Sequence, residues 1–362
     1  MVAKNRLKRF TNDAPFSYVN SMQNHAPPAF SKNTDRLNTP DLSENSVITP
    51  AIVQTNVESH KTMQTLEAVP NISEGQRPLI LNKLATAVKS VKHVALLDLS
   101  ADISHNRSVL TILGCPESVL QALTNLYEIT TAQIDLRTHR GVHPRIGAID
   151  VVPFIPIRNA SMDDCKQLSR QLAANVASHF DIPTFLYGEA ATQPGRKPLE
   201  NIRRGQFEGL PQKMKDDRWA PDFGPLRPHP SAGASAIGAR EPLIAFNVNL
   251  KTEDLAVARQ IAAIIRAKNG GLAHVKALGF KLAHRGLVQV SVNLTDYRIT
   301  PLHLVFTTIE TEARKLEVEV VDSEIVGLVP QEAISDETIQ RLRLKNFSSN
   351  KILGPQKIAT SL

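Results

Sequence analysis

The chain has 362 residues, of which 42% are hydrophobic and 21% charged, enough for one large domain or two modest domains with cores of their own. It contains no run of eighteen apolar residues, and its two cysteines form no CxxC pair, which excludes a membrane span and disfavours a disulfide framework or zinc ribbon. The net charge of +7 comes from scattered basic residues with only 5% aromatics, so we expect a solvated surface or attraction of a polycarboxylate substrate, not a nucleic-acid site.

Residues 1–65 differ in composition from the rest of the chain. They are rich in Asn, Ser, Thr, Pro and Gln and show no sustained helical or strand period, so we predict a disordered N-terminal extension. The opening MVAKNRLKRF is basic and acid-poor, which leaves an organelle transit peptide as the alternative. Asp13, Pro27 and Pro28 would interrupt an amphipathic helix there. A cytoplasmic location, which also fits the unpaired cysteines, is the preferred interpretation.

The first half of the core alternates between strand and helix patterns. Short β-rich or apolar runs predict strands at 66–69, 94–99, 108–114, 148–155 and 183–188. Three helices are predicted between them. Proline suits the first turn of the helices that begin near Pro78 and Pro116, and Ser161 is the expected N-cap of the third.

The second half of the core has a simpler order. Strands are predicted at 243–250, 274–283, 287–294 and 318–329. One helix, capped by Thr252, follows the first strand, and another begins at Thr300-Pro301 after the third. The order β-α-β-β-α-β is the ferredoxin-like split unit, and the first half repeats it with an extra helix and strand.

The predicted fold class is therefore α+β. We expect two ferredoxin-like βαββαβ-type subdomains packed sheet toward sheet, with a ligand site in the gap between them. The expected divisions are 1–65 for the extension, 66–241 and 242–335 for the two subdomains, and 336–362 for a C-terminal tail.

A loop ahead of the 148–155 strand carries the clearest chemical signal. Gly141 and Gly147 flank His143-Pro144-Arg145, and the proline keeps His143 extended and outside any helix. A histidine on a fixed loop at a sheet edge suits general acid/base catalysis near neutral pH, and Arg145 can hold a carboxylate through two hydrogen bonds. The alternative is a turn in which the histidine only satisfies backbone groups.

His139 lies four residues before His143, which is the spacing of a metal-binding pair on a helix. Gly141 and Pro144 disfavour that helix, and no third ligand is evident in the sequence. We therefore expect no metal site.

The stretch 219–240 is rich in proline and glycine and separates two well-patterned regions. Loops of this length are often functional, and small residues let a backbone approach a flat ligand closely. The alternative is a linker between subdomains. Polar residues also lie beside buried runs at 104–107 and 289–293, but Asn and Ser at strand ends are usually caps.

Eight stretches, taken together and in order, resemble the formiminotransferase domain family. They are VPNISEGQ (69–76), DISHNRS (102–108), RGVHPRIGAIDVVPFIPI (140–157), PTFLYGEA (183–190), WAPDFGP (219–225), GAREPLIAFNVNL (238–250), VQVSVNLTDY (288–297) and VDSEIVGLVP (321–330). Each stretch is moderately specific, and their shared order over residues 66–335 makes the resemblance strong.

The resemblance implies an enzyme that moves the formimino group of N-formimino-L-glutamate to N5 of tetrahydrofolate, giving 5-formiminotetrahydrofolate and L-glutamate. This is a step of histidine degradation and one-carbon metabolism. The resemblance also implies two α/β subdomains with the folate in a tunnel between them. The family's catalytic histidine falls on His143. Its folate-binding segment falls on Gly224, Pro225, Leu226, Arg227, Pro228, His229, Pro230, Ser231, Ala232 and Gly233.

The reaction implied by the resemblance needs two proton transfers, and one histidine can perform both in turn. We expect tetrahydrofolate as co-substrate and no metal, because a protonated amidine is already activated. Mammalian members carry a cyclodeaminase domain after the transferase. Only about thirty residues follow here, so we expect that activity to be absent.

The sequence departs from the family at several positions. Val142 stands where members often have Glu, and Ser100 stands where the animal enzymes carry an acidic residue. Asp102 is then the candidate acid that orients the catalytic histidine, with Arg145 as further support. The folate-binding segment is also more polar than in animal members, at Arg227 and His229.

Three other functions compete with this hypothesis. The same folate site could serve formyl transfer from N-formylglutamate, or bind folate without turnover. A nucleic-acid module ranks last, because the ferredoxin-like order lacks an RNP-like aromatic pattern on its middle strands. We expect small-molecule partners and a homodimer, without nucleic acid or membrane.

Overall fold

A computed structural model of the protein describes residues 64–345 and 347–361. The predicted disordered extension, with its transit-peptide alternative, therefore lies outside the described residues apart from positions 64 and 65. The described residues all fall in one unit of mutual contacts. Within them, no helix is long and apolar enough to cross a membrane.

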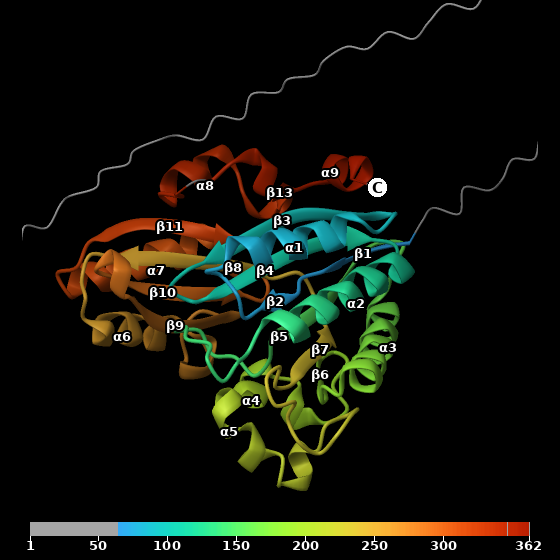
Figure 1. Cartoon of the computed structure of the whole chain (residues 1–362). Coiled ribbons are helices and arrows are strands. Elements are labelled where there is room, and N and C mark those ends of the chain that lie inside the picture. Colours follow the sequence, from blue (N-terminus) through green and yellow to red (C-terminus); the bar gives the residue numbers. More distant parts are fainter. Residues whose placement is uncertain (1–63, 346, 362) are drawn as a thin grey trace, which may run out of the picture. The chain divides into compact units, whose positions relative to one another are not determined.

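The N-terminal part of the chain builds the larger sheet, called here the N-terminal sheet (Figure 1). Its strands are β1 Thr65–Ala68, β2 Asn71–Ile72, β3 Val94–Asp102, β4 Arg107–Gly114, β5 Ile149–Arg158, β6 Thr184–Gly188 and β7 Ser235–Ala239. Both β1 and β2 lie between β4 and β5, and β3 pairs with the other side of β4, all antiparallel. β7 runs parallel between β5 and β6.

Three helices cover one face of the N-terminal sheet (Figure 1). They are α1 Pro78–Lys89, α2 Pro116–Gln133 and α3 Met162–Phe180. Ser161 and Asp164 cap α3 reciprocally, which confirms the predicted cap. Leu84 of α1 and Leu123 of α2 are fully buried in one core with Leu66 of β1, and each such side chain contributes roughly 1.5–3 kcal/mol of stability.

The C-terminal half builds a second sheet, the C-terminal sheet. Its strands are β8 Ile244–Leu250, β9 Val275–Leu282, β10 Leu287–Leu294 and β11 Val320–Val326, with helices α6 Leu255–Ile265 and α7 Leu302–Lys315. The predicted element order β-α-β-β-α-β is confirmed. The strand order is β11-β8-β10-β9, all antiparallel. Part of the N-terminal sheet has the same arrangement, in the order β5, then β1 and β2, then β4 and β3. α6 begins later than predicted, because Asp254 and not Thr252 caps it.

The face of the C-terminal sheet that points away from its helices is polar. Along β8, Phe246 and Val248 lie in the core with α6 and α7, so the alternating Asn247 and Asn249 point to the opposite face. Hydrogen bonds join this side to the β3–β4 end of the N-terminal sheet, among them His105 with Gln289 (3.0 Å), Ser104 with His284 (2.5 Å) and the Gly327 N–H with Ser100 Oγ (3.4 Å). The two sheets, with helices packed on one face of each, confirm the predicted α+β class.

The segment between β6 and β8 holds elements that were not predicted. α4 Leu199–Arg203 and α5 Gln206–Lys213 are short, and Gly205 and Pro211 obscure any helical period. β7 falls inside the stretch 219–240, and our prediction of a loop is wrong for those residues. The small side chains of β7 give no strand pattern in the sequence. The packing requires them, because a Cβ at Gly238 would lie 2.3 Å from the Tyr187 carbonyl oxygen.

The described residues after 335, predicted as a tail, form short elements. They include α8 Asp336–Arg341, a 3-10 turn at Ser349–Lys351, β13 Ile352–Leu353 and α9 Pro355–Thr360. β13 pairs in parallel with β12 Val329–Pro330, and Ser323 of β11 donates a hydrogen bond to the carbonyl oxygen of Leu342. Part of this segment is therefore attached to the C-terminal sheet.

Candidate active site

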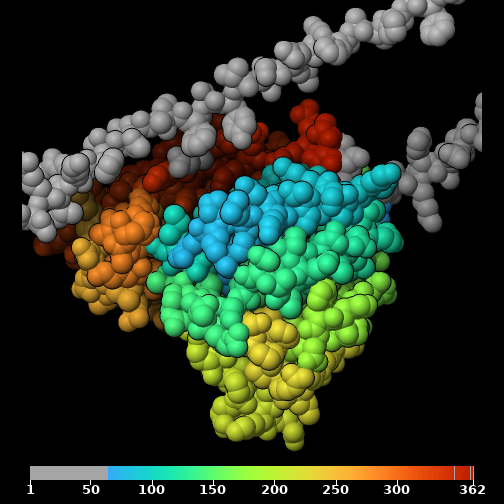
Figure 2. All heavy atoms as spheres, viewed as in Figure 1, coloured from blue at the N-terminus to red at the C-terminus, as the bar shows by residue number. Residues whose placement is uncertain are grey.

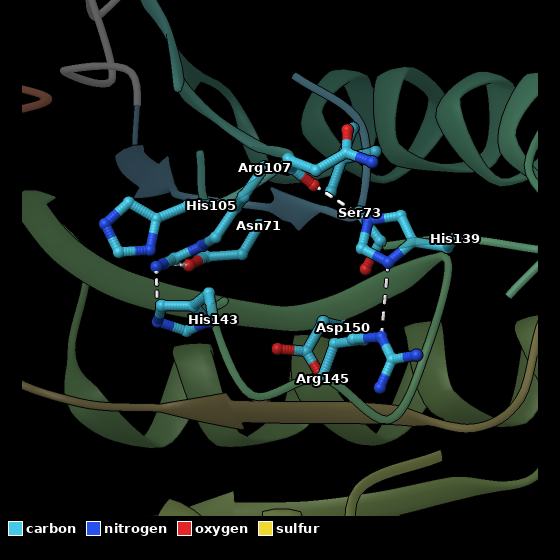
Figure 3. A pocket seen from close by; sticks show the side chains of 10 residues that line it. Asn71, Ser73, His105, Arg107, His139, His143, Arg145 and Asp150 are labelled. Atoms are coloured by element: carbon cyan, nitrogen blue, oxygen red, sulfur yellow. Dashed lines mark hydrogen bonds between the residues drawn. The ribbon is translucent and has the colours of Figure 1, made fainter. Parts of the chain in front are cut away.

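The loop between α2 and β5 carries His143, and close backbone packing fixes its course. A Cβ at Gly141 would lie 2.2 Å from the carbonyl oxygen of His105, and one at Gly147 would lie 2.0 Å from that of Ala234. Only glycine fits at such distances. The two glycines therefore hold the loop against its neighbours, and His143 projects beside the Arg107 side chain (Figure 3).

Hydrogen bonds determine the tautomer of His143. An arginine can only donate, so Nε2 of His143 accepts from the Arg107 guanidinium at 2.7 Å. The other ring nitrogen, Nδ1, donates to the carbonyl oxygen of Pro144 at 2.8 Å. The imidazole is neutral in this arrangement, with its proton on Nδ1.

The surroundings of His143 favour this neutral form. Burial lowers the pKa of His143 well below its ordinary value, and the positive charges of Arg107 and Arg203 lower it further. A hydrogen bond to the Pro144 carbonyl opposes the shift only weakly, as the smallest of the causes. A neutral histidine at physiological pH is the form that a general base requires.

Arg107, on β4, is held from two sides. Besides His143 it donates to Oδ1 of Asn71 on β2. Burial and the neighbouring Arg203 lower the pKa of Arg107 to about 9, while Asp150 and Asp102 oppose that shift. Arg107 lies in the stretch 104–107, whose polar residues we expected to be strand-end caps, although that stretch and the one that contains Asn71 both carry the family resemblance.

A buried ion pair lies close to Arg107 and His143. Asp150 of β5 pairs with Arg203 of α4, and its other oxygen accepts from the backbone N–H of Ile146 at 2.8 Å. The pair joins the loop that carries His143 to the unpredicted helix α4. Neither Asp150 nor Arg203 was singled out from the sequence, since their pairing depends on the position of that helix.

Asp102, the predicted orienting acid, contacts a different group. Its Oδ1 accepts from the backbone N–H of His105 at 2.6 Å, and the contacts of the His143 ring are with Arg107 and Pro144. Asp102 therefore shapes the β3–β4 turn and adds negative charge near Arg107.

The β3–β4 turn also supplies a second histidine to the site. The ring centroid of His105 lies 5.8 Å from that of His143, and Phe280 of β9 lies 5.9 Å from His143. Nε2 of His105 bonds to Gln289 of β10 at 3.0 Å, which in turn donates to Asn249. This network links the site to the polar face of the C-terminal sheet.

Arg145 and His139 form a separate pair. Arg145 donates to Nδ1 of His139 at 3.2 Å and pairs with Glu208 of α5 at 2.7 Å. His139 donates through Nε2 to the carbonyl oxygen of Asn106 at 2.9 Å. Both ring nitrogens of His139 thus serve the packing of the loop. No cluster of three metal-ligating side chains occurs among the described residues.

The segment 224–233 approaches the site only at its end. His229 and Gly233 exchange backbone hydrogen bonds of 2.8 and 3.0 Å, and Gly233 pairs with Gly147 beside the His143 loop. Figure 2 shows residues near 230, in yellow, next to the loop near 140, in green. The start of the segment points elsewhere, because Arg227 pairs with Asp181 at the end of α3 and Leu226 is exposed.

The side chains that line the pocket around His143 are mostly polar (Figure 3). They include Asn71, Ser73, His105, Arg107, His139, Arg145 and Asp150. A neutral histidine beside cationic side chains suits the transfer of a proton to or from an anionic substrate.

Comparisons with known proteins agree with the resemblance seen in the sequence. The family model described as "Formiminotransferase domain, N-terminal subdomain" matches residues 65–240. The model described as "Formiminotransferase domain" matches residues 245–349.

Curated relatives match most of the chain. A glutamate formimidoyltransferase of Streptococcus pyogenes is 43% identical over 286 residues, which are 79% of this chain and 96% of the relative. That of Thermoplasma acidophilum is 43% identical over 293 residues and is also covered to 96%. The formimidoyltransferase-cyclodeaminase of Rattus norvegicus is 41% identical over 278 residues, but the match spans only 51% of that protein.

Proposed function

Because the chain belongs to the formiminotransferase domain family, we propose that His143 is the acid/base of a glutamate formimidoyltransferase. The enzyme transfers the formimino group of N-formimino-L-glutamate to N5 of tetrahydrofolate, which is its co-substrate. The products are 5-formiminotetrahydrofolate and L-glutamate. One observation carries the role of His143: its neutral tautomer, with Nε2 as acceptor, beside two arginines.

The transfer proceeds by addition and elimination. N5 of tetrahydrofolate attacks the amidine carbon and a C–N bond forms, while Nε2 of His143 takes the proton from N5. The bond between that carbon and the glutamate nitrogen then breaks, and the same proton passes from Nε2 to the leaving nitrogen. No net proton is gained or lost, so one histidine is sufficient.

The folate is proposed to lie in a tunnel between the two subdomains, 66–241 and 242–335, and to contact the segment 224–233. The pairing of Gly233 with Gly147 supports this placement, because it puts the end of the segment beside the His143 loop. The tip of the segment, near Arg227, lies farther out, where it is suited to the more polar end of a folate. Asp102 and Arg145 support the site through the turns that they hold.

The location and assembly of the enzyme remain predictions. Both cysteines are free thiols, which supports a cytoplasmic enzyme. We also propose that the enzyme is a homodimer, that it needs no metal, and that it acts on small-molecule substrates and does not bind nucleic acid.

An assay with two donors tests the function. We expect conversion of tetrahydrofolate with N-formimino-L-glutamate and little with N-formyl-L-glutamate. Turnover with the formyl donor alone would establish formyl transfer. Calorimetric binding of tetrahydrofolate without turnover of either donor would establish a folate-binding protein instead.

Replacement of the segment 227–231 by a Gly/Ser linker of equal length tests the folate site. We expect weaker tetrahydrofolate binding with an unchanged melting temperature, because these residues lie outside the three hydrophobic cores. Unchanged affinity would show that the segment is only a linker.

A further inference from the structure

We propose that Arg107 binds the α-carboxylate of the formimino donor, and that this contact releases Nε2 of His143 so that it can accept the proton of N5. The inference rests on the proposed function and adds a substrate-binding and positioning role for Arg107. It follows from the two hydrogen bonds of His143 and from the missing carboxylate partner of Arg107.

Both ring nitrogens of His143 are engaged in this structure. Nδ1 donates to Pro144, and Nε2 accepts from Arg107 at 2.7 Å. A lone pair that already accepts a hydrogen bond from a guanidinium cannot also take a proton from N5. The base therefore becomes competent only after Arg107 turns to another acceptor.

Arg107 differs from three other arginines whose side chains are mostly buried. Arg145, Arg196 and Arg203 each have an ion-pair partner, which is Glu208, Asp222 and Asp150 respectively. Arg107 makes no such pair in this part of the chain, and its two acceptors, a neutral imidazole and an amide, carry no charge. Its Nε is buried without a hydrogen-bond partner, as are those of Arg196, Arg203 and Arg266, so the missing counter-ion is what sets it apart from Arg196 and Arg203. A partly buried guanidinium without a counter-ion lowers the stability of the folded protein, and a ligand that supplies the negative charge removes this penalty.

The acids near Arg107 are already occupied. Asp150 bonds to Arg203 and to the backbone of Ile146, and Asp102 bonds to the backbone of His105. Neither carboxylate forms an ion pair with Arg107 in the described part of the chain, so a carboxylate of the substrate can take that place.

The chemistry of the donor identifies which of its two carboxylates fits. The α-carboxylate is attached to the carbon that bears the leaving nitrogen, whereas the γ-carboxylate is two carbons farther away. His143 must reach that leaving nitrogen, and Arg107 contacts His143 directly. A planar guanidinium can bind a carboxylate through two parallel hydrogen bonds, which a neutral imidazole cannot match.

A pair of donors isolates the contact. Arg107→Gln and the conservative Arg107→Lys are assayed with N-formimino-L-glutamate and with the formimino derivative of 4-aminobutyrate, which lacks only the α-carboxylate. For the glutamate donor we expect KM to rise roughly 10- to 100-fold in both variants. The second donor cannot make the contact and should therefore have a high KM with the unaltered enzyme, and in the variants that KM should stay within about twofold. Equal losses with both donors, or unchanged KM, would overturn the inference.

A second variant keeps the test open if Arg107→Gln does not fold. Asn71→Asp is isosteric and gives Arg107 a carboxylate from the chain itself, so it should raise KM for the glutamate donor but not for the analogue. Arg298→Gln is the matched control, because it removes the same charge from an exposed arginine paired with Asp296. A raised KM in the control would show a general charge effect and sink the inference.

The pH profile separates positioning from a merely structural role. Arg107 is one of the charges that depress the pKa of His143, so the acid limb of kcat/KM should move upward in Arg107→Gln, toward about pH 6.5. An unmoved limb would contradict the proposed contact. The other groups that face this pair and stay in the variant are Arg203 of α4, Asp150 of β5, Asp102 of β3 and His105 of the β3–β4 turn.

Failure of this inference is distinguishable from failure of the proposed function. If the unaltered enzyme does not transfer the formimino group at all, the function itself is wrong and the inference falls with it. If it does, and Arg107→Lys shows no selective loss with the glutamate donor, only the inference is overturned.

Discussion

Two histidines lie four residues apart on one loop, each beside an arginine, and the difference between the two histidine–arginine pairs separates packing from chemistry. In both pairs an arginine donates to a ring nitrogen, and the other ring nitrogen donates to a backbone carbonyl. Arg145, in the pair with His139, is neutralised by Glu208. Arg107, in the pair with His143, has no such partner among the described residues. The His139 pair, whose arginine has an ion-pair partner, stabilises the loop. The His143 pair, whose arginine has none, can bind a substrate carboxylate.

The largest expected effect comes from removing each histidine in turn. His143→Asn should lower kcat by ~10²–10⁴-fold, because it removes the only proposed acid/base, while other contacts keep tetrahydrofolate affinity within a few-fold. His139→Asn should leave kcat within a few-fold, since both nitrogens of that ring serve packing. Steady-state kinetics and calorimetry check both. Near-normal turnover of the His143 variant would break the comparison.

Removal of the buried acid behind the His143 pair should have the largest effect on stability. Asp150→Asn leaves Arg203 buried beside Arg107 without a counter-charge. We expect a loss of roughly 3–5 kcal/mol in the free energy of unfolding, as for other broken buried ion pairs. Urea denaturation checks this loss. A loss below about 1 kcal/mol would mean that solvent reaches the pair.

Both histidines should make stability depend on pH. Each has a pKa below its ordinary value in the folded protein, so below about pH 6.5 the unfolded chain binds protons that the folded protein does not. Stability should therefore fall as pH is lowered, by at most about 1.4 kcal/mol per pH unit for each histidine. Glu67, whose pKa is raised to about 7, has the opposite slope over part of this range. The test is thus the difference between the His143→Asn variant and the unaltered protein.

The smallest effect on stability is expected when Arg145 loses its ion-pair partner, so that the His139 pair resembles the His143 pair. Glu208→Gln removes the counter-charge of Arg145, but the Glu208 side chain is 63% exposed, so water screens the charge that remains. We expect a loss of about 0.5–1 kcal/mol without a change in kcat. A large fall in kcat would show that the His139 pair takes part in the chemistry.

Patterns that lie within one stretch of sequence were the ones that could be predicted. Pro144 and the glycines on either side of it indicate the histidine loop, and the alternation along 243–250 indicates a strand with one polar face. The N-cap Ser161 was predicted for the same reason, since its partner Asp164 is three residues away.

Features that depend on distant partners could not be predicted. Arg107 and Asn71 meet on neighbouring strands whose register no local pattern reveals. Asp102 was the nearest acid in sequence to the expected position, but the β3–β4 turn directs it to a backbone N–H. The small residues of β7 and the brief helix α4 show too little periodicity to be recognised.

The position of β7 has a consequence for how the protein folds. β7 follows β6 in the chain but lies between β5 and β6, and it is the only strand that pairs with β6 among the described residues. Until residues 235–239 have been synthesised, β5 presents an unpaired edge and β6 has no strand partner, which is the state in which sheets aggregate or slip. The Gly147–Gly233 bridge lies just before β7. This bridge can form only after Gly233 has been synthesised, so the loop that carries His143 gains that contact later than its contacts with β4.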